Sequence, residues 1–156
     1  MDEQRRRELV AQYKAGYDTV ADAVAGITET ELDARPAPGK WSPREIVHHL
    51  ADSEMTAAIR LRLLLAEGSP AIQGYDQDEF ARRLHYDRPI AASLAALQAA
   101  RATTGELLDR MSEADWGRAG THSEIGPYPA TRWLEIYAVH AHQHAEQIRA
   151  ARASAR

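Results

Sequence analysis

Apolar residues recur at spacings of three and four along four long segments, and this periodicity constrains the fold of the 156-residue chain most. The same spacing repeats on one face of an α-helix, so each segment predicts an amphipathic helix. The four stripes are Leu9, Tyr13, Tyr17, Val20, Val24, Ile27; Ile46, Leu50, Ser53, Ala57, Leu61, Leu64; Ile90, Leu94, Leu97, Thr104, Leu107, Met111; and Trp133, Tyr137, His140, His144, Ile148. They predict an all-α fold, a four-helix bundle with long connections.

Local signals mark several helix ends. Ser42 is placed to cap the second helix, Pro43 suits its first turn, and Glu45 completes a capping box. The first helix is expected to stop near Gly26, and the second before the turn residues 68–70.

Proline, capping and turn residues mark the boundaries in the rest of the chain. Pro89 opens the third helix, and Thr131 is the predicted cap of a last helix that runs to about Arg152. Residues 78–84 could form a short helix, and another short turn is expected at 112–116. Turn residues dominate 117–129, a pattern compatible with a small hairpin. The connection 68–88 has the length of a binding loop or lid.

Composition narrows the class of protein. A hydrophobic content of 44% suits one domain spanning residues 1–156. The 19 basic residues stand against 23 acidic ones, which disfavours a basic face for nucleic acid. No run of about 18 apolar residues and no signal-peptide pattern occurs, so we expect no membrane partner and a cytoplasmic protein. The absence of cysteine excludes disulfides, thiolate metal sites and a cysteine nucleophile.

Histidines provide the strongest chemical signal. His140 and His144 are four residues apart, so their imidazoles lie one helical turn apart on the same face. His49 lies beside the apolar stripe of the second helix, whereas His48 is rotated by about 100°. Three histidines that converge would hold a metal ion and leave positions open for chemistry. The sequence therefore predicts His49, His140 and His144 as metal ligands.

For other polar and aromatic residues, a structural role is weighed against a functional one. A lone histidine on an apolar face is often a satisfied core residue, and a histidine pair alone is a moderate signal. We assign His85, His122 and His142 to surface or loop positions by default. Three glutamates, Glu54, Glu135 and Glu146, could orient a ligand imidazole or belong to a solvated helix face. The three tryptophans, Trp41, Trp116 and Trp133, are expected to be packing anchors. Tyr75 and Asp76 could line a substrate entrance, although an ordinary turn is the preferred reading.

The segment from Trp41 to Met55, followed by the segment from Tyr137 to His144, resembles the DinB superfamily. Within it, the chain is most similar to YfiT-type metal-dependent hydrolases, which overlap with the bacillithiol transferases. The resemblance covers nearly the whole chain, including Gly74-Tyr75-Asp76. It implies a four-helix bundle with rearranged connectivity, a homodimer, and a divalent metal held by three histidines. Carried over by position, these ligands are again His49, His140 and His144.

The resemblance also suggests a function. Gln143 and Gln147 stand where related chains often place further histidines, which leaves the substrate open. A zinc or nickel ion held by three imidazoles can activate water for hydrolysis, or it can bind a thiol as thiolate. The family context favours a low-molecular-weight thiol, such as bacillithiol, that attacks an electrophilic small molecule. The alternatives are a hydrolase of another small substrate and a noncatalytic, metal-stabilised stress-associated protein. The sequence identifies no catalytic acid or base.

Overall fold

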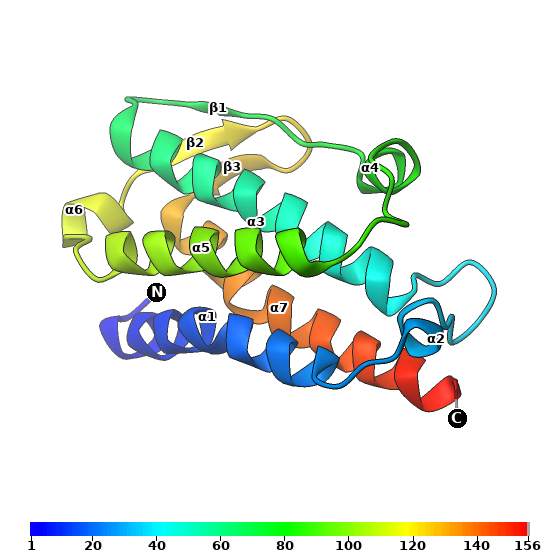
Figure 1. Ribbon diagram of the computed structural model, residues 1–156. Helices are drawn as coiled ribbons and strands as arrows, with labels where there is room; N and C mark the ends of the chain where they lie inside the picture. The colour runs from blue at the N-terminus through cyan, green and yellow to red at the C-terminus, as the bar shows by residue number, and fades with distance from the viewer. Residues whose placement is uncertain (156) are drawn as a thin grey trace.

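The computed structural model describes residues 1–155, in which four long helices lie side by side (Figure 1). They are α1 (Glu3–Val24), α3 (Pro43–Ala66), α5 (Ala91–Leu108) and α7 (Ala130–Ser154). The shorter elements are α2 (Glu29–Leu32), β1 (Ala71–Ile72), α4 (Gln77–Arg83), α6 (Glu113–Trp116), β2 (Ala119–His122) and β3 (Gly126–Pro129). The predicted helical bundle is confirmed. No helix within residues 1–155 combines the length and apolarity that a membrane crossing requires.

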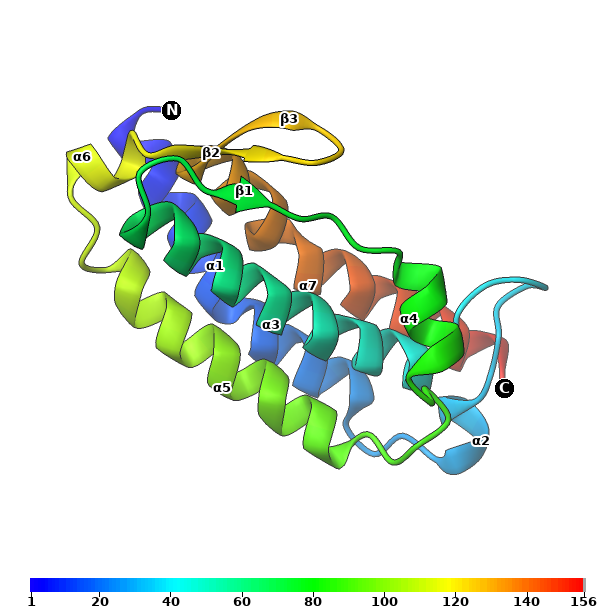
Figure 2. The ribbon, with the colours of Figure 1, turned by 90° about the horizontal axis from the view of Figure 1, so that it is seen from above.

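The four long helices do not simply alternate in direction. Helices α1 and α7 run the same way, opposite to α3 and α5 (Figure 1). Helix α1 packs against α7 and α5, and α3 packs against the same two helices. Because α3 and α5 are parallel, the chain between them must return along the length of the bundle. This crossover, residues 67–90, carries β1 and α4 past one side of α3 (Figure 2).

A small sheet covers the C-terminal half of α3 and the start of α7 (Figures 1 and 2). Strands β2 and β3 form an antiparallel hairpin with Gly120 opposite Tyr128. The hairpin agrees with the turn-rich pattern of residues 117–129. Strand β1, which the sequence did not predict, pairs with β2 in parallel. A two-residue strand carries no periodic signal, so only the crossover brings it to the hairpin.

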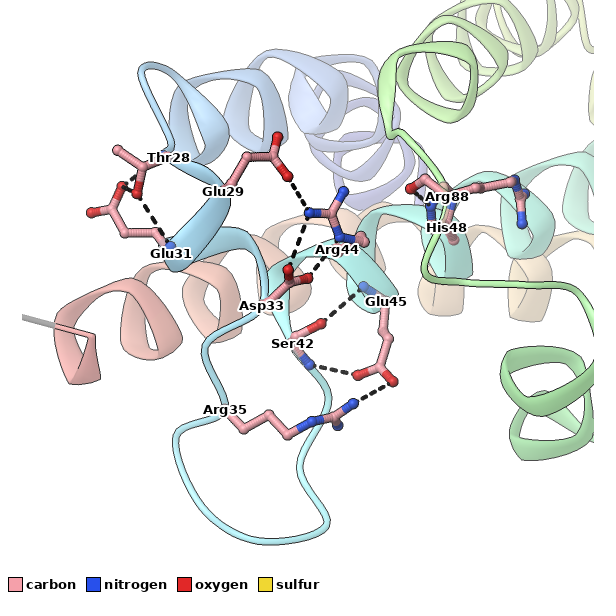
Figure 3. A network of polar contacts seen from close by, with 10 residues as sticks. All are labelled: Thr28, Glu29, Glu31, Asp33, Arg35, Ser42, Arg44, Glu45, His48 and Arg88. Carbon is pink, nitrogen blue, oxygen red and sulfur yellow. Dashed lines mark hydrogen bonds and ion pairs between the residues drawn. The ribbon is translucent and has the colours of Figure 1, made fainter.

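The start of α3 is fixed by a network of polar side chains (Figure 3). The predicted capping box is present, because Ser42 caps the backbone of Glu45 and the Glu45 carboxylate accepts from the Ser42 amide. The buried Arg44 side chain then binds Asp33 at 2.7 Å and Glu29 at 2.5 Å. These contacts attach α2 to the first turn of α3, one turn before His48 and His49.

Two local predictions differ from the structure. Helix α7 is preceded by Pro129 as its N-cap, not by Thr131, because β3 runs directly into the helix and the Ala130 amide donates to the Arg118 carbonyl. Helix α2 was not predicted in the connection 28–40. Its signal was nevertheless present, since Thr28 and Glu31 form a capping box around a single helical turn.

The core divides into two apolar clusters with a charged layer between them. One cluster, around Trp133, Leu134 and Leu61, lies near the sheet, and the other, around Leu50, Leu97 and Ile148, lies toward α2. Along α3 and α5, the residues of one cluster are separated from those of the other by Glu54 and Arg101, which form an ion pair at 2.5 Å. Both side chains are almost fully buried. The prediction that Glu54 orients an imidazole or faces solvent is therefore wrong.

The guanidinium of Arg101 joins all four long helices. It donates to the Tyr13 carbonyl of α1 at 3.1 Å and to the Tyr137 carbonyl of α7 at 3.4 Å, and it lies over the Tyr13 ring at 4.0 Å. The Tyr13 hydroxyl donates to the second oxygen of Glu54. Burial raises the pKa of Glu54, and Arg101 and the Tyr13 hydroxyl oppose that rise.

Gly16 makes room for this guanidinium. A Cβ atom at Gly16 would lie 2.6 Å from Arg101 Nη2 and 2.9 Å from Ala141 Cβ. A Cβ at Gly105, a helical glycine of α5, would meet only the flexible Lys14 side chain, at 3.5 Å. The two glycines therefore differ in whether a methyl group fits.

We predict opposite effects of alanine at these two glycines. Gly16→Ala should lower the free energy of unfolding by about 1–3 kcal/mol, because the overpacking outweighs the gain in helix propensity. Gly105→Ala should raise it by about 0.5–1 kcal/mol, since the helix gains without a clash. Urea denaturation followed by circular dichroism measures both. Equal stabilisation by both variants would show that Arg101 does not constrain α1.

Candidate metal centre

Three histidines from two helices converge at one point of the bundle. His49 of α3 and His140 of α7 face each other with their Nε2 atoms 3.4 Å apart. The Nε2 atom of His144, one turn further along α7, lies 3.2 Å from that of His140. The candidate ligand atoms of all three lie within 4.8 Å of one another. The structure thus brings together the three residues that the sequence selected.

This spacing fits the donor set of a metal ion. Two metal–nitrogen bonds of about 2.0–2.1 Å at a tetrahedral angle place their nitrogens about 3.3 Å apart. The two shorter distances in the cluster match that value. Three imidazole nitrogens are also a ligand set typical of zinc, nickel and related ions. The His49, His140 and His144 cluster could therefore hold one divalent metal.

The lowered pKa values of the three imidazoles also suit metal binding. Burial, followed by the nearby His144, lowers the pKa of His49 to about 3. Burial, followed by His144 and His49, lowers the pKa of His140 to about 2. Burial also lowers the pKa of His144. All three rings are therefore neutral near pH 7, as a metal ligand must be.

Neighbouring side chains orient two of the rings. The Gln147 Oε1 atom lies 2.8 Å from His144 Nδ1, so it accepts the Nδ1 proton and leaves the Nε2 lone pair toward the cluster. His49 Nδ1 is buried without a hydrogen-bond partner among residues 1–155. Packing against Trp41, with ring centroids 4.8 Å apart, holds this ring instead.

Two hollows meet at the cluster. A cavity of about 160 Å³ is lined by His49 and His140 together with Ser53, Arg60, Tyr75, His122 and Tyr137. A groove of about 570 Å³ is lined by His144 together with Trp41, Lys40 and Gln147. Gln77, at the start of α4, lines both. The crossover between α3 and α5 therefore helps to form the walls on both sides of the histidines.

Several default assignments from the sequence are corrected here. His122 was expected at a surface or loop position, but it is buried on β2 and lines the cavity. Tyr75 lines the cavity too, so the entrance reading is favoured over an ordinary turn. Asp76 instead caps α4. Trp41 lines the groove, beyond its expected role in packing.

Other assignments agree with the sequence. His48 is rotated away from the cluster and bonds Ser93 at 2.7 Å and the Arg88 carbonyl at 2.9 Å. His85 is exposed. His142 lies outside the cluster, half-buried, where it contacts Thr19 and the Gln12 carbonyl. The remaining two glutamates, Glu135 and Glu146, are exposed and pair with arginines of their own helix.

Arg60 and His122 are the site residues that the sequence reasoning missed. On α3, His49, Ser53 and Arg60 are spaced by four and seven residues, so one face of the helix presents all three to the cavity. That spacing was a usable signal for Arg60. No local pattern pointed to His122, because its burial depends on the docking of the hairpin over α3 and α7.

The chain is similar to proteins with names that refer to a metal. It is 35% identical to "Putative metal-dependent hydrolase OB0782" of Oceanobacillus iheyensis over 127 residues, which cover 81% of this chain and 74% of the relative. A protein of Bacillus licheniformis, also named as a putative metal-dependent hydrolase, is 32% identical over 160 residues, 97% of this chain and 87% of the relative.

Solved structures share the fold. YfiT from Bacillus subtilis, described as a probable metal-dependent hydrolase with an unusual four-helix bundle topology, superposes with a TM-score of 0.89 at 27% identity. The match covers 95% of this chain and 86% of YfiT. The mycothiol-dependent maleylpyruvate isomerase superposes with a TM-score of 0.74 over 92% of this chain and 60% of its own. At 12% identity, that likeness concerns the fold alone.

The sequence profile of the DinB superfamily matches residues 12–148, which is most of the chain. The parallel arrangement of α3 and α5 agrees with the description of YfiT as an unusual four-helix bundle topology. The chain belongs to the DinB superfamily.

Proposed function

We propose that His49, His140 and His144 bind one divalent metal ion, zinc or nickel, in an enzyme that acts on small molecules. The convergence of three neutral Nε2 atoms at metal-ligand spacing supports this proposal most strongly. The relatives named as metal-dependent hydrolases support it independently. A metal held there would supply Lewis acidity to lower the pKa of a coordinated water or thiol.

We propose further that the nucleophile is the thiol of a low-molecular-weight cosubstrate such as bacillithiol, transferred to an electrophilic small molecule. The two hollows support this reading, because a transferase must hold two compounds at once. His144 borders the groove, while His49 and His140 border the cavity. The chain contains no cysteine of its own, so the thiol must come from a bound molecule. A neighbour in fold is mycothiol-dependent, as its name states.

Hydrolysis of a small substrate is the second candidate. The names of the similar proteins favour it. It would use only one of the two hollows for substrate and would need no added thiol. The assays below separate the two reactions.

The first prediction from this proposal concerns the metal content of the protein. Purified protein should carry about one equivalent of zinc or nickel, and His49→Ala, His140→Ala and His144→Ala should each lose it, because two imidazoles bind far more weakly than three. Plasma mass spectrometry on tag-free protein measures this. His142→Ala is the matched control, since His142 lies on the same helix outside the cluster. Wild-type protein that is metal-free and cannot be reconstituted would contradict the proposal.

The second prediction concerns Gln147. Gln147→Leu should weaken metal binding about tenfold. This factor is the lower end of the range for losing a hydrogen bond that orients a metal ligand, because water can replace the exposed Gln147 amide. Competition with a chromogenic chelator measures the affinity. Gln143→Leu, an exposed residue on the same helix, should leave the affinity unchanged. An equal loss in both variants would point to a general effect on α7 instead.

The third prediction concerns the reaction. Metal-loaded protein should accelerate the conjugation of bacillithiol, mycothiol or glutathione to monochlorobimane, and His49→Ala should not. Fluorescence of the conjugate reports the rate. Failure with all three thiols would refute the transferase proposal. Turnover of ester or amide panels without thiol would then establish the hydrolase instead.

A further inference from the structure

The cavity beside the histidines contains a buried arginine without an acidic partner. Arg60 is only 8% exposed, and it forms no ion pair with any carboxylate of residues 1–155. Its guanidinium donates to the Tyr137 hydroxyl at 2.9 Å and to the Gln73 carbonyl at 2.6 Å, and it lies 5.9 Å from the centre of the Tyr75 ring. Its Nε atom is buried and has no partner within that part of the chain.

These contacts leave the charge of Arg60 uncompensated. All three partners are neutral groups, and a buried cation is costly unless an anion pairs with it. The other arginines that are buried within residues 1–155 have such anions, since Arg101 pairs with Glu54, Arg44 with Asp33 and Arg6 with Glu113. Arg60 therefore differs from the arginines that only support the fold.

The cavity around Arg60 is rich in hydrogen-bond donors. The backbone amide of Glu124 donates to His122 Nδ1 at 3.1 Å, which leaves the proton of the neutral ring on Nε2. Tyr137 accepts from Arg60, so its own hydroxyl proton is available to another acceptor. Tyr75 and Ser53 add two further hydroxyls to the wall. Among the lining residues, Glu124 is the acidic one, and it is exposed.

We propose that this cavity binds the oxyanion group, carboxylate or phosphate, of an acidic small-molecule substrate, with Arg60 as its counter-ion. A guanidinium and an oxyanion form charge-assisted hydrogen bonds, and Arg60 lines the cavity without a carboxylate that would occupy it in place of a ligand. His49 and His140 line the same cavity, so a substrate anchored at Arg60 extends toward the histidine cluster. The inference rests on the proposed function, because it identifies the class of substrate for that site.

The test is an NMR titration of the zinc-loaded 156-residue chain with acetate, phosphate and the uncharged acetamide. The Arg60 Nε–H resonance should shift saturably with an oxyanion and not with acetamide, and the tighter of the two anions identifies the acid group. Arg60→Gln should weaken anion binding about tenfold or more. Arg62→Gln is the matched control, because Arg62 lies on the same helix but bonds Thr103 and Thr104 away from the cavity. It should leave the affinity unchanged.

Further variants keep the test decisive. Glu124→Gln should tighten anion binding, since it removes the negative charge from the wall. If Arg60→Gln does not fold, as judged by circular dichroism, Tyr75→Phe and Arg60→Lys replace it, and each should weaken binding by a smaller factor. Equal binding of acetate and acetamide, or unchanged anion affinity in the Arg60 variants, would overturn the proposal.

Repeating the titration on His140→Ala separates this inference from the metal proposal. If wild-type protein cannot be loaded with zinc and anion binding at Arg60 is the same in wild type and His140→Ala, the anion site is supported while the metal centre is refuted. Normal metal content with no binding at Arg60 would overturn the anion site alone.

Discussion

The buried pair of Arg101 and Glu54 is the constraint on which the bundle depends. An ion pair in the core is stable only when each partner meets further polar groups, and here the Tyr13 hydroxyl and the carbonyls of Tyr13 and Tyr137 provide them. These groups come from all four long helices, so the pair fixes their mutual register. The neighbouring turns of α3 and α7 carry His49 and His140, which places the candidate metal site within a rigid frame.

The route of the chain between α3 and α5 creates the surroundings of that frame. Parallel helices require a crossover, and the crossover contributes Tyr75 and Gln77 to the walls around the histidines. The β2–β3 hairpin adds His122 from the other side. A bundle with short antiparallel connections would lack both walls. The topology therefore explains which segments wall the site, while the helices explain how the three histidines are brought together.

The two hollows beside the three histidines differ in the burial of their cations, because Arg60 is buried and Lys40 is exposed. The imidazoles are neutral because burial lowers their pKa values, and the cavity next to them contains the unpaired cation of Arg60. The groove on the other side is lined by Trp41 and by the exposed side chains of Lys40 and Asp78. Such a division suits two different compounds that meet at one centre, an acidic substrate and a thiol cosubstrate, as we propose.

The sequence by itself determined the four long helices, the capped start of α3 and the three candidate ligands. All of these depend on spacings of three or four residues within one helix, which any α-helix converts into a shared face. Only the tertiary structure decided the direction of α5, the strand β1, the burial of His122, and the partners of Glu54 and Arg60. Glu54 and Arg101 are 47 residues apart in sequence. Glu54, Arg60 and Arg101 lie three or four residues from members of the apolar stripes, but periodicity cannot say which distant group compensates a buried charge.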